Sequence, residues 1–319
     1  MTSAVKTAGG MPRALRPQGS LLATRIARNW QPYLFLAPAL LYFAVFHYGP
    51  MYGVQIAFKN FLATKGIFRS PWVGFYHFER LFRSFQFPII VKNTILLSVG
   101  NLVLGFPVPI VFALLLNQIR NRTFKRVVQT VTYAPYFIST VVVAGLIFLF
   151  TKLDTGIINI ALTRLGLEQV FFMGSAGWFR PLYIISGIWQ HTGWDSIIYL
   201  AALSSISPEL HEAALADGAG KIQRIWHIDL PGIVPTAIVL FILRAGQIMR
   251  LGFEKVYLMQ TSLNLENSEV ISTYVYKIGL QQAQFSLGSA TELFNSVINL
   301  ALILLVNRIA RSLSDTSLW

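Results

Sequence analysis

The chain has 319 residues, of which 54% are hydrophobic and only 12% are charged. An ordinary soluble domain carries about 25% charged residues, so this composition excludes a soluble enzyme as well as disordered, collagen-like and coiled-coil chains. The formal net charge is +13, but the basic residues are scattered among apolar segments, which favours contact with membrane lipid over a nucleic-acid partner. Without cysteine, the chain can form neither disulfides nor cysteine-based metal sites.

The N-terminal segment 1–29 is rich in small residues and carries five basic residues and no acidic one. It predicts a disordered cytoplasmic tail, followed by an uncleaved signal anchor. The short loop 117–126 adds four basic residues on the same side of the membrane. The positive-inside rule therefore places the N-terminus in the cytoplasm, although the basic first outer loop makes this preference weak.

Six apolar segments are long enough to cross a membrane as helices. Their continuous apolar character favours an all-α polytopic membrane protein with six transmembrane helices over a β-barrel. The first should bend near its outer end, where His47, Gly49 and Pro50 weaken it. The spans lie at about 33–56, 94–116, 127–151, 181–206, 232–249 and 286–306, within a transmembrane domain over 30–313 that is followed by a short tail, 314–319.

Polar groups inside the last three spans indicate a cavity or a partner, because such groups are costly in lipid. Asp195 and Arg244 lie at similar depths. They can form a buried ion pair, or Arg244 can face a cavity and bind a substrate carboxylate. Aromatic rings and amides also suit the C–H faces and hydroxyls of a sugar. The further candidates for the substrate path are Trp189, Gln190, Trp194, Tyr199, Gln247 and Asn295.

His191 precedes Asp195 by four residues and shares its helical face. One interpretation is a hydrogen-bonded structural pair. The other is a proton relay in an ion-coupled secondary transporter, a class that usually carries an inverted repeat. The sequence shows no internal repeat, which weighs against the second interpretation.

The cytoplasmic loop 207–231 predicts two short helices at a sharp angle. Ser207 can cap the first helix, and Pro208 suits its first position. Gly218 can adopt the left-handed conformation that ends a helix, and Pro231 marks the return to the membrane. Such a helix fits a groove on another protein, but these residues are equally compatible with a plain connection between spans.

The string from Glu212 to Pro231 resembles the Glu-Ala-Ala loop of binding-protein-dependent ABC importer permeases. It contains Glu-Ala-Ala-x-x-Asp-Gly-Ala and, after a spacer, x-Leu-Pro. Further stretches resemble the maltose-permease-like oligosaccharide branch of that family, and within it the permeases of alginate-oligosaccharide importers. These stretches are Phe46–Gln55, Pro71–Phe75, Lys92–Thr94, Tyr133–Pro135, Gly252–Lys255 and Ser314–Trp319.

The resemblance implies a type I ABC importer permease fold in the bacterial inner membrane, with both termini in the cytoplasm. The implied partners are a second permease that completes a heterodimer, a dimer of ABC ATPases, and a periplasmic or lipid-tethered solute-binding protein. The loop would be the coupling helix that docks on the ATPase, through Glu212, Ala213, Ala214, Asp217, Gly218 and Ala219.

The implied activity is ATP-driven import of an oligosaccharide by alternating access. An acidic sugar such as a uronate oligomer agrees with both the alginate resemblance and Arg244, while a neutral sugar remains the alternative. The chain has no G-x-x-x-x-G-K-[ST] phosphate loop. We therefore expect no catalytic residue, bound cofactor or metal in this chain, with ATP and Mg held by the partner ATPases.

Overall fold

A computed structural model describes residues 29–246, 248–249 and 251–313. The candidate Gln247 and the tails expected at 1–28 and 314–319 therefore lie outside the described residues. The chain divides into two compact units, 1–55 and 56–319. Within the described ranges the regular structure is helical, with one isolated antiparallel bridge between Lys59 and Trp72. The expected all-α class is confirmed.

The first unit contains one run of helix. It begins as α2 (Trp30–Phe43), widens into the π-helical turn η1 (Ala44–Tyr48), and continues through α3 (Gly49–Met51) into the 3₁₀ helix η2 (Tyr52–Phe58) at the unit boundary. Proline lacks an N–H donor, and the wider turn directly precedes the Gly49–Pro50 pair. The irregularity expected near these residues is therefore present.

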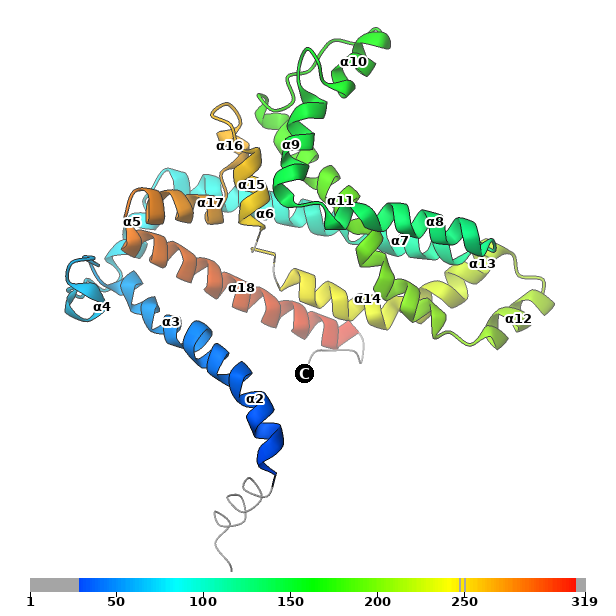
Figure 1. The fold of residues 1–319 in the computed structure, drawn as a ribbon, viewed down its shortest axis with the longest axis horizontal. Helices are drawn as coiled ribbons and strands as arrows, with labels where there is room; N and C mark the ends of the chain where they lie inside the picture. The colour runs from blue at the N-terminus through cyan, green and yellow to red at the C-terminus, as the bar shows by residue number, and fades with distance from the viewer. Residues whose placement is uncertain (1–28, 247, 250, 314–319) are drawn as a thin grey trace, which may run out of the picture. The chain divides into compact units, whose positions relative to one another are not determined.

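The second unit holds the remaining helices (Figure 1). In chain order they are α4 (Gly66–Arg69), α5 (Tyr76–Phe82), α6 (Gln86–Gly105), α7 (Pro107–Asn117), α8 (Arg122–Tyr133), η3 (Ala134–Phe137), α9 (Thr140–Thr151), α10 (Ile157–Arg164), α11 (Ala176–Ser204), α12 (Pro208–Ala216), α13 (Lys221–Arg224), η4 (Ile225–Asp229), α14 (Leu230–Ala245), α15 (Phe253–Met259), α16 (Leu265–Ser268), α17 (Ile271–Val275), η5 (Tyr276–Gln281) and α18 (Phe285–Leu313).

Four helical segments of the described chain are long and apolar enough to cross a membrane, and each overlaps an expected span. They are Trp30–Phe58, Gln86–Asn117, Lys221–Ala245 and Phe285–Ile309. At the fourth expected span, α11 is long enough with its 29 residues, but its polar side chains leave it outside this apolar set.

The expected third span, 127–151, is wrong as a single helix. The structure has two helical segments, Arg122–Phe137 and Thr140–Thr151, which meet at 100° and count as a fifth span only when taken together. Pro135 interrupts the helical hydrogen bonding, and Ser139 starts α9 by accepting a hydrogen bond from the N–H of Val142 at 3.4 Å.

Helix α11 lies at the centre of the second unit. The described residues of this unit form three hydrophobic clusters, and α11 contributes side chains to two of them. One joins Leu97 of α6 and Val143 of α9 to Phe179 and Tyr183 of α11, and the other joins α7, α11 and α14. Near Gly193 the backbone of α11 comes so close to α8 that a Cβ atom would lie 2.1 Å from the carbonyl oxygen of Thr132. This packing surrounds the cavity described next.

Candidate functional site

The loop 207–231 folds as its local sequence predicts. The Ser207 Oγ accepts a hydrogen bond from the N–H of Glu209 at 3.3 Å, which caps the start of α12. Gly218 has φ +80°, and the N–H of Ala219 then donates to the carbonyl of Ala214 at 2.8 Å. The left-handed glycine thus ends α12 and turns the chain toward α13, as expected.

Helix α12 contains no buried residue. Glu212, Ala213, Asp217 and Gly218 are exposed, whereas Ala214 and Ala219 are half-buried. Two large apolar side chains of the same helix are also exposed, Leu210 at 55% and Leu215 at 54%. The helix therefore presents small, acidic and apolar groups together, and Figure 1 shows it with α13 at one end of the second unit, away from α15 and α16.

A buried carboxylate ties this loop to the helices behind it. Asp229, at the start of α14, is fully buried. Its Oδ2 accepts a hydrogen bond from the Nε2 of Gln118 at 3.0 Å, and its Oδ1 lies 3.3 Å from the Nε2 of His211 on α12. One side chain thus joins α12, α14 and the end of α7. This contact was not predicted, although the acidic residue at the first position of the x-Leu-Pro element was a signal.

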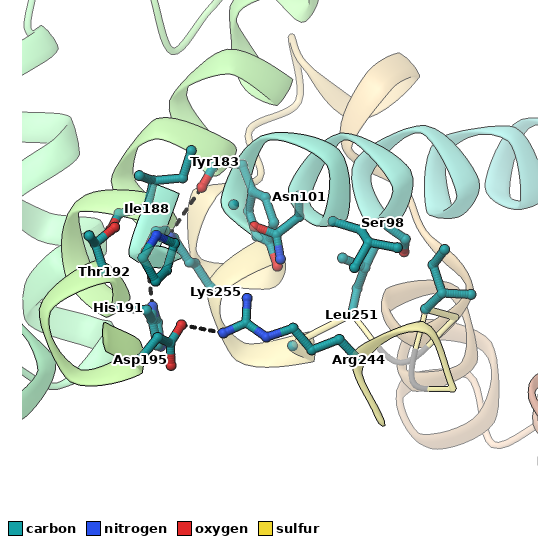
Figure 2. Close-up of a pocket in the computed structure, with 16 residues that line it drawn as sticks. Ser98, Asn101, Tyr183, Ile188, His191, Thr192, Asp195, Arg244, Leu251 and Lys255 are labelled. Carbon is teal, nitrogen blue, oxygen red and sulfur yellow. Dashed lines mark hydrogen bonds and ion pairs between the residues drawn. The ribbon is translucent and has the colours of Figure 1, made fainter. Parts of the chain in front are cut away.

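A cavity of about 310 Å³ lies between α6, α7, α11, α14 and α15 (Figure 2). Ser98 and Asn101 of α6 line it opposite α11, and α14 and α15 each contribute a basic side chain. The polar lining includes His191, Asp195, Arg244 and Lys255. Two of the predicted path residues, Asp195 and Arg244, therefore lie together in the cavity wall.

Arg244 and Asp195 form an ion pair that bridges α14 and α11 in this wall (Figure 2). Both side chains stay partly exposed, Arg244 at 36% and Asp195 at 23%. The sequence analysis treated a buried pair and a cavity-facing arginine as alternatives. In the structure the two residues are paired and also line the cavity.

The expected hydrogen bond between His191 and Asp195 is not formed. The Nδ1 of His191 instead lies 3.0 Å from the carbonyl oxygen of Gly187, one turn earlier in α11. Arg244 forms the ion pair with the Asp195 carboxylate, and His191 contacts a backbone carbonyl of its own helix instead. The proposed proton relay loses its geometric basis.

Five other predicted path residues do not line this cavity. Gln190 is buried and donates from Nε2 to the carbonyl of Ile138 at 3.0 Å, at the break between α8 and α9. Trp194 stacks on Tyr136, with ring centroids 4.5 Å apart. Tyr199 is buried in the cluster between α7, α11 and α14.

The fourth of these residues is Trp189, which lines a separate apolar cavity beside α9 and α10. The fifth candidate outside the polar cavity is Asn295, a buried residue of α18. Most of the aromatic and amide candidates therefore pack helices together, which the sequence alone could not separate from contact with a sugar.

Lys255 is the cavity residue that the sequence analysis missed. Its side chain is only 9% exposed, and its Nζ donates to the carbonyl oxygen of Tyr183 at 3.2 Å. The same Nζ lies 5.0 Å from the centre of the Tyr183 ring. Burial lowers the pKa of Lys255 to about 8. The lysine that ends the Gly252–Lys255 stretch, one of the stretches that carry the resemblance, was the available signal.

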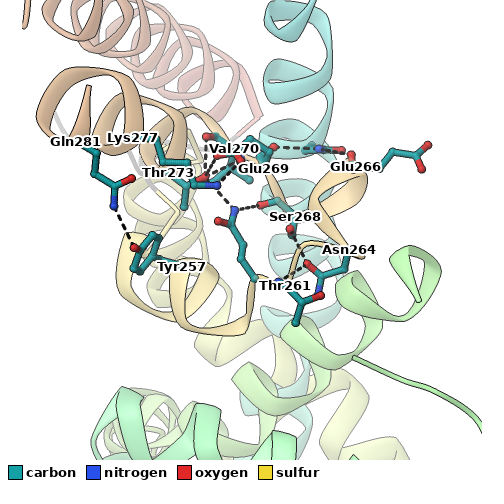
Figure 3. A network of polar contacts seen from close by, with 12 residues as sticks. Tyr257, Thr261, Asn264, Glu266, Ser268, Glu269, Val270, Thr273, Lys277 and Gln281 are labelled. Atoms are coloured by element: carbon teal, nitrogen blue, oxygen red, sulfur yellow. Dashed lines mark hydrogen bonds and ion pairs between the residues drawn. The ribbon is translucent and has the colours of Figure 1, made fainter. Parts of the chain in front are cut away.

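Lys255 lies on α15, at the start of a connection that contains a network of polar contacts. Figure 3 shows this network. Lys277 pairs with Glu269 at 2.5 Å, and the hydroxyl of Thr273 donates to the same carboxylate at 2.7 Å. The hydroxyl of Ser268 donates to the Oδ1 of Asn264 at 2.9 Å. Gln260, at the end of α15, donates from Nε2 to the carbonyl of Ser268 at 2.9 Å and to the hydroxyl of Thr273 at 3.2 Å. These contacts join α15, which carries Lys255, to α16 and α17.

Among the described residues, no three or more His, Cys, Asp or Glu side chains lie close enough together to hold a metal ion.

Comparison with known proteins identifies the family. Residues 105–315 match the family described as "Binding-protein-dependent transport system inner membrane component". Protein LplB of Bacillus subtilis (strain 168) is 44% identical over 287 residues, which are 90% of each chain. The polygalacturonan/rhamnogalacturonan transport system permease protein YteP of the same organism is also 44% identical, over 90% of this chain and 89% of its own.

A solved structure has the same fold. It is a chain of a bacterial ABC transporter involved in the import of the acidic polysaccharide alginate, with a TM-score of 0.86 and 43% identity. The match covers 92% of this chain and 99% of that one. A second structure of a bacterial alginate ABC transporter, in complex with a periplasmic protein carrying an alginate pentasaccharide, matches with a TM-score of 0.86 and 42% identity.

The helical architecture, the Glu-Ala-Ala loop and these matches agree with one another, and they do not favour a secondary transporter. The chain belongs to the binding-protein-dependent transport system inner membrane components and is a multi-pass, type I ABC importer permease for sugars or oligosaccharides.

Proposed function

We propose that this chain imports an acidic oligosaccharide, such as a uronate oligomer, as one of the two permease subunits of its importer. The observation that carries the proposal is the charge of the cavity: its described lining has two strong cations, Arg244 and Lys255, against one carboxylate, Asp195. A carboxylate-bearing sugar would balance this excess of positive charge. The named substrates of YteP and of the alginate transporter point to the same class.

The driving force comes from partners in this proposal. A dimer of ABC ATPases binds ATP and Mg, and a periplasmic or lipid-tethered protein delivers the sugar. The exposed face of α12, with Glu212, Leu215 and Asp217, docks on one ATPase. When the ATPases close, the paired coupling helices move together and the cavity turns outward. ATP can drive this change only because the ATP-bound partners favour one state over the other.

The contact of Asp229 with His211 and Gln118 explains how motion of α12 reaches the helices around the cavity. Asp229 stands at the start of α14, and Arg244 stands in the last turn of that helix. A displacement of α12 is therefore passed to the helix that carries a cavity residue. In this arrangement α12 lies in the cytoplasm, and so do both termini.

Purification with native neighbours followed by transport assays tests the proposal. The chain would be co-expressed with its neighbours, purified in mild detergent and reconstituted into liposomes. We expect a second permease and an ATPase to co-purify, and liganded binding protein to stimulate ATP hydrolysis with oligouronides. If only neutral oligosaccharides stimulate ATP hydrolysis, the proposal of an acidic substrate is wrong. If the chain transports alone and without ATP, the proposal that ATPase partners drive transport is wrong.

A further inference from the structure

We infer that Lys255 is the residue that selects acidic substrates: its buried ammonium binds the carboxylate of the sugar in the cavity, while Arg244 serves the ion pair with Asp195. This inference rests on the proposed function and names the group within the cavity that recognises the substrate.

The two cations of the cavity differ in what already neutralises them. Arg244 is paired with Asp195, so its charge is largely satisfied before any substrate arrives. Lys255 is in contact with a carbonyl oxygen and an aromatic ring of Tyr183, and the described residues place no carboxylate within ion-pair distance of it. An ammonium has three donors, and the hydrogen bond to the carbonyl oxygen of Tyr183 uses only one of them.

A buried ammonium without a counter-ion is costly, because burial removes its hydration. The lowered pKa of Lys255 expresses this cost, and with a value of about 8 the side chain is still mostly protonated at neutral pH. An arriving carboxylate would supply the missing counter-ion and accept the free N–H donors. Lys255 should therefore favour an acidic sugar over a neutral one, since a neutral hydroxyl compensates the charge of the ammonium less well.

Access to the ammonium is open on the cavity side. A Cβ atom built on Gly187 would lie 3.5 Å from the Nζ of Lys255 and 3.7 Å from the Oδ1 of Asn101. The glycine therefore leaves the space beside the ammonium free, where any larger residue would fill it. Asn101 adds an amide beside the same opening, suited to a sugar hydroxyl.

The other titratable groups around Lys255 are few. Helix α11 presents Tyr183, His191 and Asp195, and α14 presents Arg244. Of the remaining helices packed on α15, α9 has no charged residue and α17 contributes Tyr274. Glu254, the neighbour of Lys255 on α15, is exposed and does not line the cavity. Asp195 is therefore the one carboxylate in the described cavity lining, and Arg244 pairs with it.

The test uses the complete importer in liposomes with its binding protein. Lys255→Met removes the charge at similar volume, and Lys255→Arg retains it. Lys152→Met is the control, because Lys152 is an exposed lysine outside the cavity lining. Uptake is measured for an oligouronide and for its carboxyl-reduced form. Every variant is assayed with the same binding protein, so the preference of that protein cancels in each variant-to-wild-type ratio.

We expect Lys255→Met to lower uptake of the oligouronide by about tenfold or more, because one charge-assisted contact is lost, and to leave uptake of the reduced oligomer unchanged. Lys255→Arg should keep most of the preference, and Lys152→Met should keep all of it. In the wild type the preference for the acidic form should decline as the pH rises through about 8, because Lys255 loses its proton. The arginine variant should keep its preference there.

Thermal stability separates a binding role from a structural one. The pKa of Lys255 is lower in the folded protein than the ordinary value of 10.5, so below pH 8 the charged lysine destabilises the fold, and this effect fades as the pH rises from about 8 toward 10.5. Lys255→Met should therefore melt at the same or a higher temperature at neutral pH. A lower melting temperature, or an equal loss of uptake for both sugars, would overturn the inference.

The outcomes also separate this inference from the proposed function. If the wild type imports the reduced oligomer but not the oligouronide, the proposed acidic substrate is wrong. If the wild type imports the oligouronide and Lys255→Met does so at the same rate, the proposed function stands and Lys255 does not select the substrate.

Discussion

Two connections flank α14, and they are built in opposite ways. The loop 207–231 before it carries α12, which has no buried residue and is held by its own caps and by one contact of Asp229. The connection 252–285 after it buries side chains of α15, α16 and α17 and ties them with hydrogen bonds between residues far apart in the chain. The first leaves its surface free for another protein, and the second completes the wall of a cavity.

This difference teaches where each kind of function is encoded. An exposed helix needs only residues that are neighbours in the sequence, so a short string can specify it. A cavity wall needs side chains from several helices at once. Substitutions in the coupling loop should therefore damage transport with little loss of stability, whereas substitutions at buried helix contacts should damage stability first.

The largest effect on transport is expected from Glu212→Lys, which reverses a charge on the exposed face of α12. Uptake should fall by about tenfold or more, and ATP hydrolysis should no longer respond to the liganded binding protein. The free energy of unfolding should change by less than about 0.5 kcal/mol, as for other surface substitutions. Uptake and thermal melting check both halves of this prediction. Glu168→Lys, the same change in an exposed outer loop, is the control, and normal uptake by Glu212→Lys would sink the docking assignment.

The largest effect on stability is expected at Gly193. In Gly193→Ala the new methyl group meets the carbonyl oxygen of Thr132, so α8 and α11 must move apart. Such overpacking costs about 1–3 kcal/mol. Thermal melting of the purified complex measures this loss. Gly145→Ala is the matched control, because no atom lies within 4 Å of its Cβ position, and it should be neutral or slightly stabilising.

A smaller loss of stability is expected when Asp229, which joins α12 to α7 and α14, is replaced. Asp229→Ala removes the acceptor of the hydrogen bond from the Nε2 of Gln118 and the contact with His211. This costs about 0.5–1.5 kcal/mol, because both partners are only half-buried and water can replace the lost group. Asp229→Asn keeps an acceptor for Gln118 and should lose less. Melting and uptake are measured together, with Asp154→Ala at an exposed site as the control. Equal behaviour of the alanine and asparagine variants would argue against the link.

The smallest effect on stability is expected at Gly218, because its left-handed backbone is strained for most residues but lies in open space. Gly218→Val should cost roughly 1 kcal/mol at the end of α12, and Gly218→Asn should cost less because asparagine tolerates this conformation. Hydrogen exchange of α12 measures the fraying, and uptake should fall with it. If valine and asparagine reduce uptake equally, the added side chain matters more than the backbone.

Several features were predictable from the sequence because they depend on neighbouring residues. Continuous apolar segments predicted the all-α class, and five of the six expected spans coincide with one continuous helical segment. Ser207 and Gly218 predicted both ends of α12. The third expected span, 127–151, is instead two helical segments that meet at an angle. Pro135 was a visible local signal for this break, but the prediction followed the continuous apolar run.

The contacts that polar and aromatic side chains make were not predictable in the same way. Gln190 and Trp194 shared the character expected of sugar contacts, yet they bind Ile138 and stack on Tyr136. Their partners lie more than 50 residues away in the chain, and no spacing rule connects them. His191 lost its expected partner to Arg244 for the same reason.

The sequence by itself therefore determined the helices, the coupling loop and the family resemblance, since periodicity, caps and short strings act between neighbouring residues. Only the tertiary structure decided which polar groups line the cavity. It placed Lys255 beside Tyr183 and left its ammonium without a carboxylate, because burial and charge pairing depend on which helices meet there.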